Sequence, residues 1–495
     1  MKYIYITILI VCSLMVFNSC VDLDQEPKSF LTEEEYIELP QDINTVELAA
    51  TGLYHSFWDS NYGFCCRMFR FECAADQLVS SPKPNNVLEN MVTLNPDAGA
   101  NGKTSSAMWA NMWNVITGAN KLIVGTPVPK DEAEAKKYKS VLAEAHFMRG
   151  LSYFYLVRLF GDVPAITKPS EATKPQERVA VETIYNDIIV PDALYAAEYL
   201  PTTSRSGFSS TPSQWAGKTF LANVYLTMAG WPLKLGQSYY QKAADTTLDI
   251  INNSNLSLTD SYEGLWKEIR KEEANEHLFA LHNSVDQRVA SQYGKSFYPR
   301  DYKLAGWADY YANPDYMGKY PEGARKDFVY MTSWSTKGGV INWKESLDGL
   351  PCIAKYQDYN QGPAGKSQLS NGITPIFRYA EVLLIYAEAS NLATGTVNSK
   401  ALQCLQQIQR RAGIEEAKIT TTTDSNTFDT AVFNERGYEF IAEYRRWFDL
   451  VRREKLAEVK PVYYIKSVFK ENNHYYFPID LNDISMTSWK NNPGY

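Results

Sequence analysis

The longest helical pattern in the chain runs from Tyr138 to Pro164. Apolar or small residues recur there at alternating steps of three and four, which places them on one face of an α-helix. A second face is apolar as well, through Leu142, Leu151, Phe154 and Val157. Gly161 stands where a C-cap is needed, and Pro164 cannot continue the helix. Because this helix is apolar on two sides, we expect other helices to cover it on two sides.

Further segments with helical spacing lie on both sides of this one: Val46–Trp58, Met108–Ile123, Arg178–Pro201, Gly207–Gly230, Tyr239–Asn253, Pro375–Gly395, Ala401–Gly413 and Phe433–Lys455. Thr374 and Pro375 have the residue types of an N-cap and a first helical position. Small residues at Ala216, Gly217 and Ala222 would let a neighbouring helix approach closely. Short helices in pairs are typical of tetratricopeptide-like arrays, although the full repeat consensus is absent. Trp215 and Trp447 fall at helical spacing and are expected in the core.

The segment 254–372 has a different pattern, because helical periodicity fades and Gly, Pro, Asn and aromatic residues dominate. From Tyr293 to Trp343 there are 13 aromatic residues in 51, about twice the 13% of the whole chain. Aromatic planes pack well against the C–H faces of sugar rings. We therefore expect ligand-binding rings among Tyr298, Trp307, Tyr310, Tyr311, Trp334 and Trp343. The alternative is that most of these rings pack the segment onto the helices.

Trp307 is the strongest of these candidates, because Gly306 before it and Tyr310-Tyr311 after it suggest an exposed turn. Sugar hydroxyls also need amide and carboxylate partners. The polar segment 80–106 is a long loop, and long loops in compact domains are often functional. Asp76, Asn85 and Asn86, in or beside that loop, could supply such partners.

The N-terminus has the pattern of an export signal. Lys2 is followed by a mostly apolar run of 15 residues, Tyr3–Phe17, which is short for a membrane-spanning helix. Residues 17–20 resemble a bacterial lipobox, which would make residues 1–19 a signal peptide and Cys20 the lipidated first residue. Ordinary secretion with a free Cys20 thiol is the alternative. The acidic residues 21–27 look like a tag that directs such lipoproteins to the cell surface.

Composition and motifs argue against several classes of protein. The net charge of -8 and the pI of about 5.4 are unlike those of a nucleic-acid binder. The remaining cysteines do not form a disulfide framework, and the five histidines lack the HExxH zinc spacing. No GxSxG or GxGxxG motif is found. Glu435, Glu439 and Glu443 are interleaved with arginines, which is typical of ion pairs between residues three or four apart that fix the orientation of a helix.

Five motifs in order carry a family resemblance. They are AEAHFMRGLSYFYLVRLFGDVPAIT (143–167), IFRYAEVLLIYAEA, ALQCLQQIQRRAG, ERGYEFIAEYRRWFDLVR, and YYFPID with the terminal NNPGY. Together they resemble the SusD/RagB family of surface lipoproteins. The resemblance implies a mainly α fold: a SusD-like superhelix of tetratricopeptide-like helix pairs with an irregular, loop-rich ligand lobe. It further implies a single domain over 20–495, made of helical parts 20–253 and 373–495 around the lobe 254–372.

The same resemblance implies a function and partners. Such proteins bind nutrients at the extracellular face of the outer membrane, anchored by lipid, for a SusC-like TonB-dependent transporter. We expect an oligosaccharide ligand, no nucleic acid and no cofactor, although some members carry a structural calcium. A peptide ligand is an alternative, since part of the family is associated with peptide uptake. A helical glycoside hydrolase is another, and it would need two carboxylates at a defined separation.

Overall fold

The computed structural model describes residues 42–58, 63–80, 103–173, 176–266, 275–285, 287, 289–291, 293–303, 306–356, 371–460, 475–493 and 495. The predicted mainly α fold is confirmed. The longer helical elements are α3 (Ile43–Trp58), α4 (Gly63–Glu72), α6 (Lys103–Gly125), α7 (Glu132–Phe160), α8 (Val181–Ile184), η4 (Tyr185–Ile189), α9 (Val190–Tyr199), α10 (Gln214–Ala229), α11 (Gln237–Asn253), α15 (Tyr379–Thr394), α16 (Ser399–Arg411), α17 (Ser425–Glu439) and α18 (Arg446–Arg452). No helix in these ranges is long and apolar enough to cross a membrane.

Strands are short and pair two by two. The antiparallel pairs are β1 (Leu78–Ser80) with β5 (Tyr310–Ala312), β2 (Val163–Pro164) with β3 (Arg178–Val179), β4 (His277–His282) with β10 (Ile373–Arg378), β6 (Tyr330–Met331) with β9 (Cys352–Ile353), and β7 (Ser333–Thr336) with β8 (Gly339–Asn342). Short helices lie between and after them: α12 (Tyr293–Phe297), α13 (Pro314–Lys319), α14 (Ala324–Val329), η7 (Trp343–Glu345), α19 (Leu456–Val459) and α22 (Leu481–Met486).

Helix α7 forms where the two-sided apolar pattern predicts it. The Asp131 side chain caps its N-terminus by accepting a hydrogen bond from the Glu134 amide at 2.9 Å. At the other end the Gly161 amide donates to the Val157 carbonyl, and Gly161 has φ of +73°. A Cβ at this glycine would lie 2.7 Å from the Tyr476 ring. Both the turn and the close contact therefore require glycine here.

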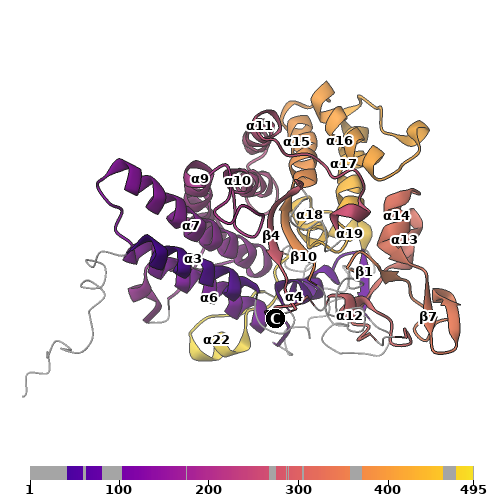
Figure 1. Cartoon of the computed structure of the whole chain (residues 1–495), viewed down its shortest axis with the longest axis horizontal. Helices are drawn as coiled ribbons and strands as arrows, with labels where there is room; N and C mark the ends of the chain where they lie inside the picture. The colour runs from indigo at the N-terminus through magenta and orange to yellow at the C-terminus, as the bar shows by residue number, and fades with distance from the viewer. Residues whose placement is uncertain are drawn as a thin grey trace, which may run out of the picture.

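The helices pack as a continuous series. α7 contacts α6 and α9, α10 contacts α9 and α11, and α15 contacts α11, α16 and α17. Figure 1 shows this arc, with the elements α12, α13, α14 and β7 gathered at one end of it. The small residues of α10 matter as expected, because a Cβ on Gly217 would lie 2.8 Å from the Ala196 backbone. Successive helix pairs that contact their neighbours are the arrangement of a tetratricopeptide-like scaffold.

The predicted start of the helix at Pro375 is wrong. Residues 373–378 form strand β10 instead, and α15 begins at Tyr379. The strand pairs with β4, with Ile373 opposite His282, and the Tyr379 amide donates to the Glu276 carbonyl at 2.8 Å. A partner strand far away in the sequence thus overrides the local N-cap signal. The end of helix α15 is as predicted, since Gly395, which follows its last residue, adopts the left-handed conformation.

The predicted helix 433–455 is also interrupted. α17 ends at Glu439 and α18 begins at Arg446, and Ala442 and Tyr444 between them have φ of +55° and +61°. Backbone carbonyls in this break accept hydrogen bonds from side chains of the loop-rich segment 254–372. Lys355 donates to the Ile441 carbonyl at 2.6 Å, and the Tyr356 hydroxyl donates to the Ala442 carbonyl at 2.6 Å. The break is therefore stabilised by tertiary contacts that local spacing does not show.

A buried ion network lies behind this break. The three glutamates at 435, 439 and 443 are all buried, and they pair with distant cations rather than with neighbours on their own helix. Arg378 contacts Glu443 at 2.8 Å and Glu276 at 2.8 Å, and Arg325 contacts Glu439 at 2.6 Å. Lys355 contacts Glu443 at 2.8 Å. The expected structural role is confirmed, but the predicted pairs between residues three or four apart on one helix are wrong. These carboxylates instead join α17, and the break that follows it, to strand β10, α14 and the lobe.

Glu72, at the end of α4, is a buried carboxyl of a different kind. Its Oε1 accepts from the Trp447 amide at 3.4 Å, and its Oε2 has no hydrogen-bond partner within the described ranges. Burial raises the pKa of Glu72 to about 8. The carboxyl is therefore mostly protonated at neutral pH in the folded protein, whereas it is ionised when the chain unfolds.

We expect Glu72→Gln to gain stability relative to the parent as the pH rises from about 4.5 to 8. A raised folded-state pKa contributes stability that is complete below the unfolded pKa and is lost as pH rises through the folded pKa. At roughly 1.4 kcal/mol per pKa unit, the difference should reach several kcal/mol. Thermal unfolding of both proteins across this range measures it. A stability difference that stays constant with pH would contradict the assignment.

Candidate ligand-binding site

Strand pairing brings the early part of the chain to the lobe. Val79 of β1 lies opposite Tyr311 of β5, and the Asn313 amide side chain donates to the Asp76 carbonyl at 2.8 Å. Strand β1, which precedes the polar segment, is therefore anchored beside the aromatic-rich segment. Asn85 and Asn86 lie outside the described residues, as does Cys20.

Four of the proposed ligand-binding rings are in the interior. Tyr298, Tyr310, Tyr311 and Trp334 are exposed by 1%, 3%, 0% and 3%. Trp334 donates from Nε1 to Asp301 at 2.9 Å, and the Tyr311 hydroxyl donates to Asp348 at 2.5 Å. A ring with no accessible face cannot stack on a sugar, so we do not retain these four as contact residues. These four rings instead have the role that the alternative predicts: they pack the lobe together.

The carboxylate of Asp76 is also engaged in an ion pair within the protein. Its carboxylate accepts two hydrogen bonds from Arg446, from Nε at 2.8 Å and from Nη2 at 2.9 Å, and the residue is only 9% exposed. A bidentate pair of this kind fixes α18 against the end of α4 and its following turn. The structure therefore gives Asp76 a structural contact and leaves its carboxylate little room for a ligand hydroxyl.

Trp307 is half-buried and lies in an irregular turn, as the neighbouring glycine suggests. Its amide donates to the Lys295 carbonyl at 2.8 Å, and the Lys295 ammonium lies 4.2 Å from the centre of its ring. A Cβ on Gly306 would lie 2.0 Å from the Tyr298 carbonyl oxygen, and Ala308 has φ of +55°. The backbone on both sides is thus constrained, so that the ring is held in place while part of it stays accessible.

Trp343 is the second half-buried ring. It begins η7, where the Asn342 and Glu345 side chains form a capping box, and its amide donates to the Thr332 carbonyl at 2.9 Å. Its ring packs against a small hydrophobic cluster of Ala308, Tyr311, Trp334 and Cys352. The cluster contains two of the buried rings and the residue next to Trp307. The buried aromatic residues of this cluster therefore support the half-exposed ring of Trp343.

Two further residues near this support were missed in the sequence. Tyr302 is half-buried, packs on the same cluster and stacks on Tyr298 with ring centres 4.5 Å apart. Its spacing of four from Tyr298 was the available signal. Asp309 lies two residues after Trp307, and burial raises the pKa of its carboxyl above the ordinary value, against the effect of a Ser296 hydrogen bond.

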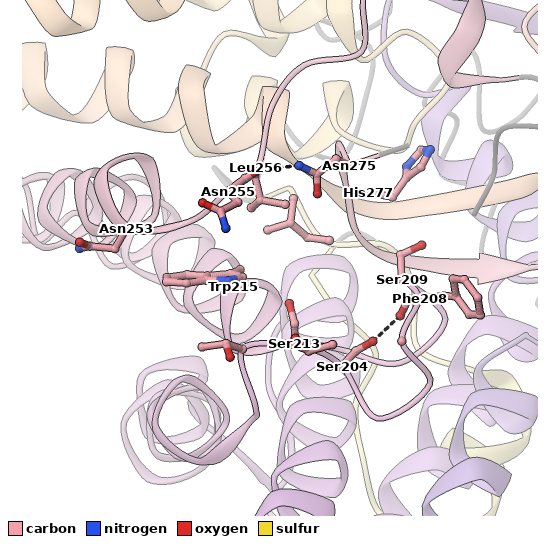
Figure 2. Close-up of a pocket in the computed structure, with 14 residues that line it drawn as sticks. Ser204, Phe208, Ser209, Ser213, Trp215, Asn253, Asn255, Leu256, Asn275 and His277 are labelled. Atoms are coloured by element: carbon pink, nitrogen blue, oxygen red, sulfur yellow. Dashed lines mark hydrogen bonds between the residues drawn. The ribbon is translucent and has the colours of Figure 1, made fainter. Parts of the chain in front are cut away.

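The two tryptophans expected in the core differ. Trp447 is fully buried, as predicted. Trp215 is only half-buried and lines a pocket beside the N-terminal end of α10 (Figure 2). Its position near a helix end leaves part of the ring uncovered, which periodicity does not reveal.

The described residues show no metal-binding cluster. No three His, Cys, Asp or Glu side chains gather there in a way that could hold an ion. Cys73, Cys352 and Cys404 are buried free thiols. The Asp358-Tyr359-Asn360 segment, which has the beginning of a calcium-loop spacing, lies outside the described ranges.

Comparisons with known proteins identify the family. Residues 325–495 match the model of the SusD family, and residues 29–226 match a model described as starch-binding, associating with outer membrane. The SusD-like protein P2 of Formosa agariphila is 28% identical over the full length of both chains.

Solved structures share the fold. A SusD superfamily protein of Parabacteroides distasonis superposes with a TM-score of 0.78 at 24% identity, over 94% of this chain and 100% of that one. A protein solved with a xylogluco-oligosaccharide gives 0.68 at 22% identity, over 85% of each chain. A laminarin-binding SusD-like protein gives 0.73 at 20% identity, over 92% and 100%. With two matching family models, a full-length relative and the shared fold, the chain belongs to the SusD/RagB family.

Proposed function

We propose that this protein is a surface glycan-binding lipoprotein that presents oligosaccharides to a SusC-like TonB-dependent transporter. The observation that carries the proposal is a pair of half-exposed tryptophans in the lobe: Trp343 packs on the buried hydrophobic cluster, and Trp307 is followed directly by Ala308, a member of that cluster. Sugar rings pack their C–H faces on such planes. The laminarin-binding and xylogluco-oligosaccharide-bound relatives of the same fold support a glycan as the ligand class.

Rigidity is the physical advantage of this arrangement. Capping, the Lys295 contact and the close approach at Gly306 fix both rings before a ligand arrives. Binding then loses little side-chain entropy, so more of the stacking energy appears as affinity.

Hydrolysis is the competing function, and the glutamates at positions 435, 439 and 443 do not favour it. Glu435, Glu439 and Glu443 are buried and ion-paired, so they cannot reach a glycosidic bond. A glycoside hydrolase needs two carboxylates facing one sugar linkage across a gap of roughly 5–9.5 Å. Binding without cleavage is therefore the function that these residues support.

A panel of glycans and peptides tests the ligand class. We expect the purified protein to bind neutral oligosaccharides, among them laminari- and xylogluco-oligosaccharides, and to return them intact after long incubation. Calorimetry gives the affinity, and chromatography of the incubated sugars detects cleavage. Binding confined to peptides would replace the glycan proposal, and shorter sugar products would show an enzyme.

We propose lipidation at Cys20 as the means of attachment, on the sequence pattern alone. More than one acyl chain gives stable anchoring, at about 0.8 kcal/mol per buried CH₂. Cys20→Ala should abolish labelling by a radioactive fatty acid and remove the protein from the reach of surface protease. Cys20→Ser is a size-matched second variant. In mild detergent the parent should copurify with a large outer-membrane barrel, and membrane attachment that persists in both variants would refute the anchor.

A further inference from the structure

A separate pocket lies beside α10 and α11, and none of the aromatic residues of segment 293–343 lines it. It has a volume of about 490 Å³, within the ~300–1,000 Å³ of small-molecule sites. Its walls come from three places: the turn before α10, the segment that follows α11, and the start of β4 (Figure 2). Phe208, 45% exposed, and Trp215 stand on opposite sides of the opening.

The lining is polar but carries no formal charge. Of the 14 residues that line the pocket, none is Asp, Glu, Lys or Arg. Burial lowers the pKa of His277 to about 4, so its imidazole is neutral at physiological pH. The polar groups are hydroxyls and carboxamides, contributed by Thr202, Thr203, Ser204, Ser209, Ser213, Asn253, Asn255 and Asn275. Both kinds of group donate and accept hydrogen bonds.

The walls are fixed by hydrogen bonds within the protein. The Ser204 hydroxyl donates to the Phe208 carbonyl at 2.6 Å, and the Ser209 hydroxyl contacts His282 Nε2 at 2.9 Å. Ser213 caps α10 by accepting from the Ala216 amide. The amide of Asn275 donates to the Asn255 carbonyl, which joins two walls and leaves the exposed Asn255 side chain directed at the opening in Figure 2.

We propose that this pocket is a second carbohydrate-binding site, which takes a short segment of a neutral sugar. Trp215 would pack against the C–H face of a ring, and the carboxamide of Asn255 would pair with hydroxyls. The nearest charges are those of Lys218, whose ammonium lies 4.9 Å from the centre of the Trp215 ring, and Asp249. They pair with each other at 2.5 Å, so a neutral polyol fits the pocket best. The ligand class rests on the proposed function, but the site is independent of Trp307. Two sites on one protein would raise the avidity for a polymer.

Fluorine NMR of the full chain labelled with 5-fluorotryptophan tests both sites at once. The chain has 11 tryptophans, and Trp215→Phe and Trp307→Phe assign the two resonances that matter. The probes are glucose, a laminari-oligosaccharide, a xylogluco-oligosaccharide and an oligogalacturonide. The detergent must lack a sugar headgroup. We expect a neutral sugar to shift the Trp215 resonance saturably, and Asn255→Ala to weaken that response about fivefold, the effect of one lost hydrogen bond.

The two proposals fail separately in this experiment. The Trp307 response should be unchanged in Asn255→Ala. If the Trp215 resonance stays fixed with every neutral probe, or moves as strongly with the oligogalacturonide, the second site is refuted. If the Trp215 resonance shifts with a neutral sugar while the Trp307 resonance does not, the second site is supported and the lobe site is refuted. Unfolding in Asn255→Ala would show as movement of all resonances, and Asn255→Leu, which keeps the size of the side chain without its hydrogen bonds, then replaces it as the test variant.

Discussion

Replacing Arg411 with methionine is expected to lower the free energy of unfolding by about 3–5 kcal/mol, because removing one partner strands buried charge. The Arg411 side chain is only 4% exposed, and it donates to Glu276 at 2.8 Å and also to Glu439. Although burial opposes ionisation, Arg411, Arg378 and Arg325 hold the pKa of Glu439 at about 2. Without Arg411 both carboxylates lose a counter-charge in the interior. Denaturant titration of parent and variant measures the loss.

The adjacent arginine provides a matched control. Arg410 lies on the same helix and pairs with Glu416, but the two side chains are 50% and 72% exposed. Surface pairs of this kind contribute little, so Arg410→Met should leave the unfolding midpoint nearly unchanged. Equal effects of the two substitutions would contradict the assignment of the stabilising network to the interior.

The same network predicts acid sensitivity. The folded-state pKa of Glu439 lies below its unfolded value, so its contribution to stability is present above about pH 4.5 and is lost as the pH falls toward 2. The pKa values of Glu276 and Glu443 are also lowered, by Arg411 and Arg378 and by Arg378 and Lys355, in each case against the opposing effect of burial. Acid should therefore loosen the attachment of the lobe to α17.

Trp307→Ala is expected to weaken oligosaccharide binding by well over tenfold and to change the melting temperature little. A stacking tryptophan is the kind of residue that contributes most to an interface, often about 2 kcal/mol or more. The ring is only half-buried, and its turn is held by backbone contacts that alanine retains. Isothermal calorimetry with the sugar that binds most tightly gives the change in affinity, and calorimetric melting tests the fold.

Trp489→Ala is the matched control for this prediction. Trp489 is also half-buried, but it packs on the helical scaffold and donates from Nε1 to the Gln176 carbonyl at 3.0 Å. Its loss should leave ligand affinity unchanged. If Trp307→Ala binds as well as the parent, or if it unfolds, Trp307 is not a ligand platform and the lobe site must be sought elsewhere.

The sequence could predict those features whose cause is local. The two-sided apolar pattern of α7 with its terminal glycine, the small residues of α10 and the Gly395 cap all follow from spacing and backbone conformation. The candidate site was only partly predictable. Thirteen aromatics close together mark the lobe, but one ring in such a cluster looks like another in the sequence.

Tertiary structure decided what each of those residues faces. Residues 373–378, where the sequence predicts the start of a helix, pair with strand β4 and form strand β10 instead. Contacts from Lys355 and Tyr356 stabilise the break after α17. Two of the partners of Glu439, Arg378 and Arg325, lie 61 and 114 residues away in the sequence. Burial and ion pairing are properties of the assembled core. The amino-acid sequence by itself therefore determined the helices and the family, while only the packed chain decided which rings support the site and which ones a ligand can reach.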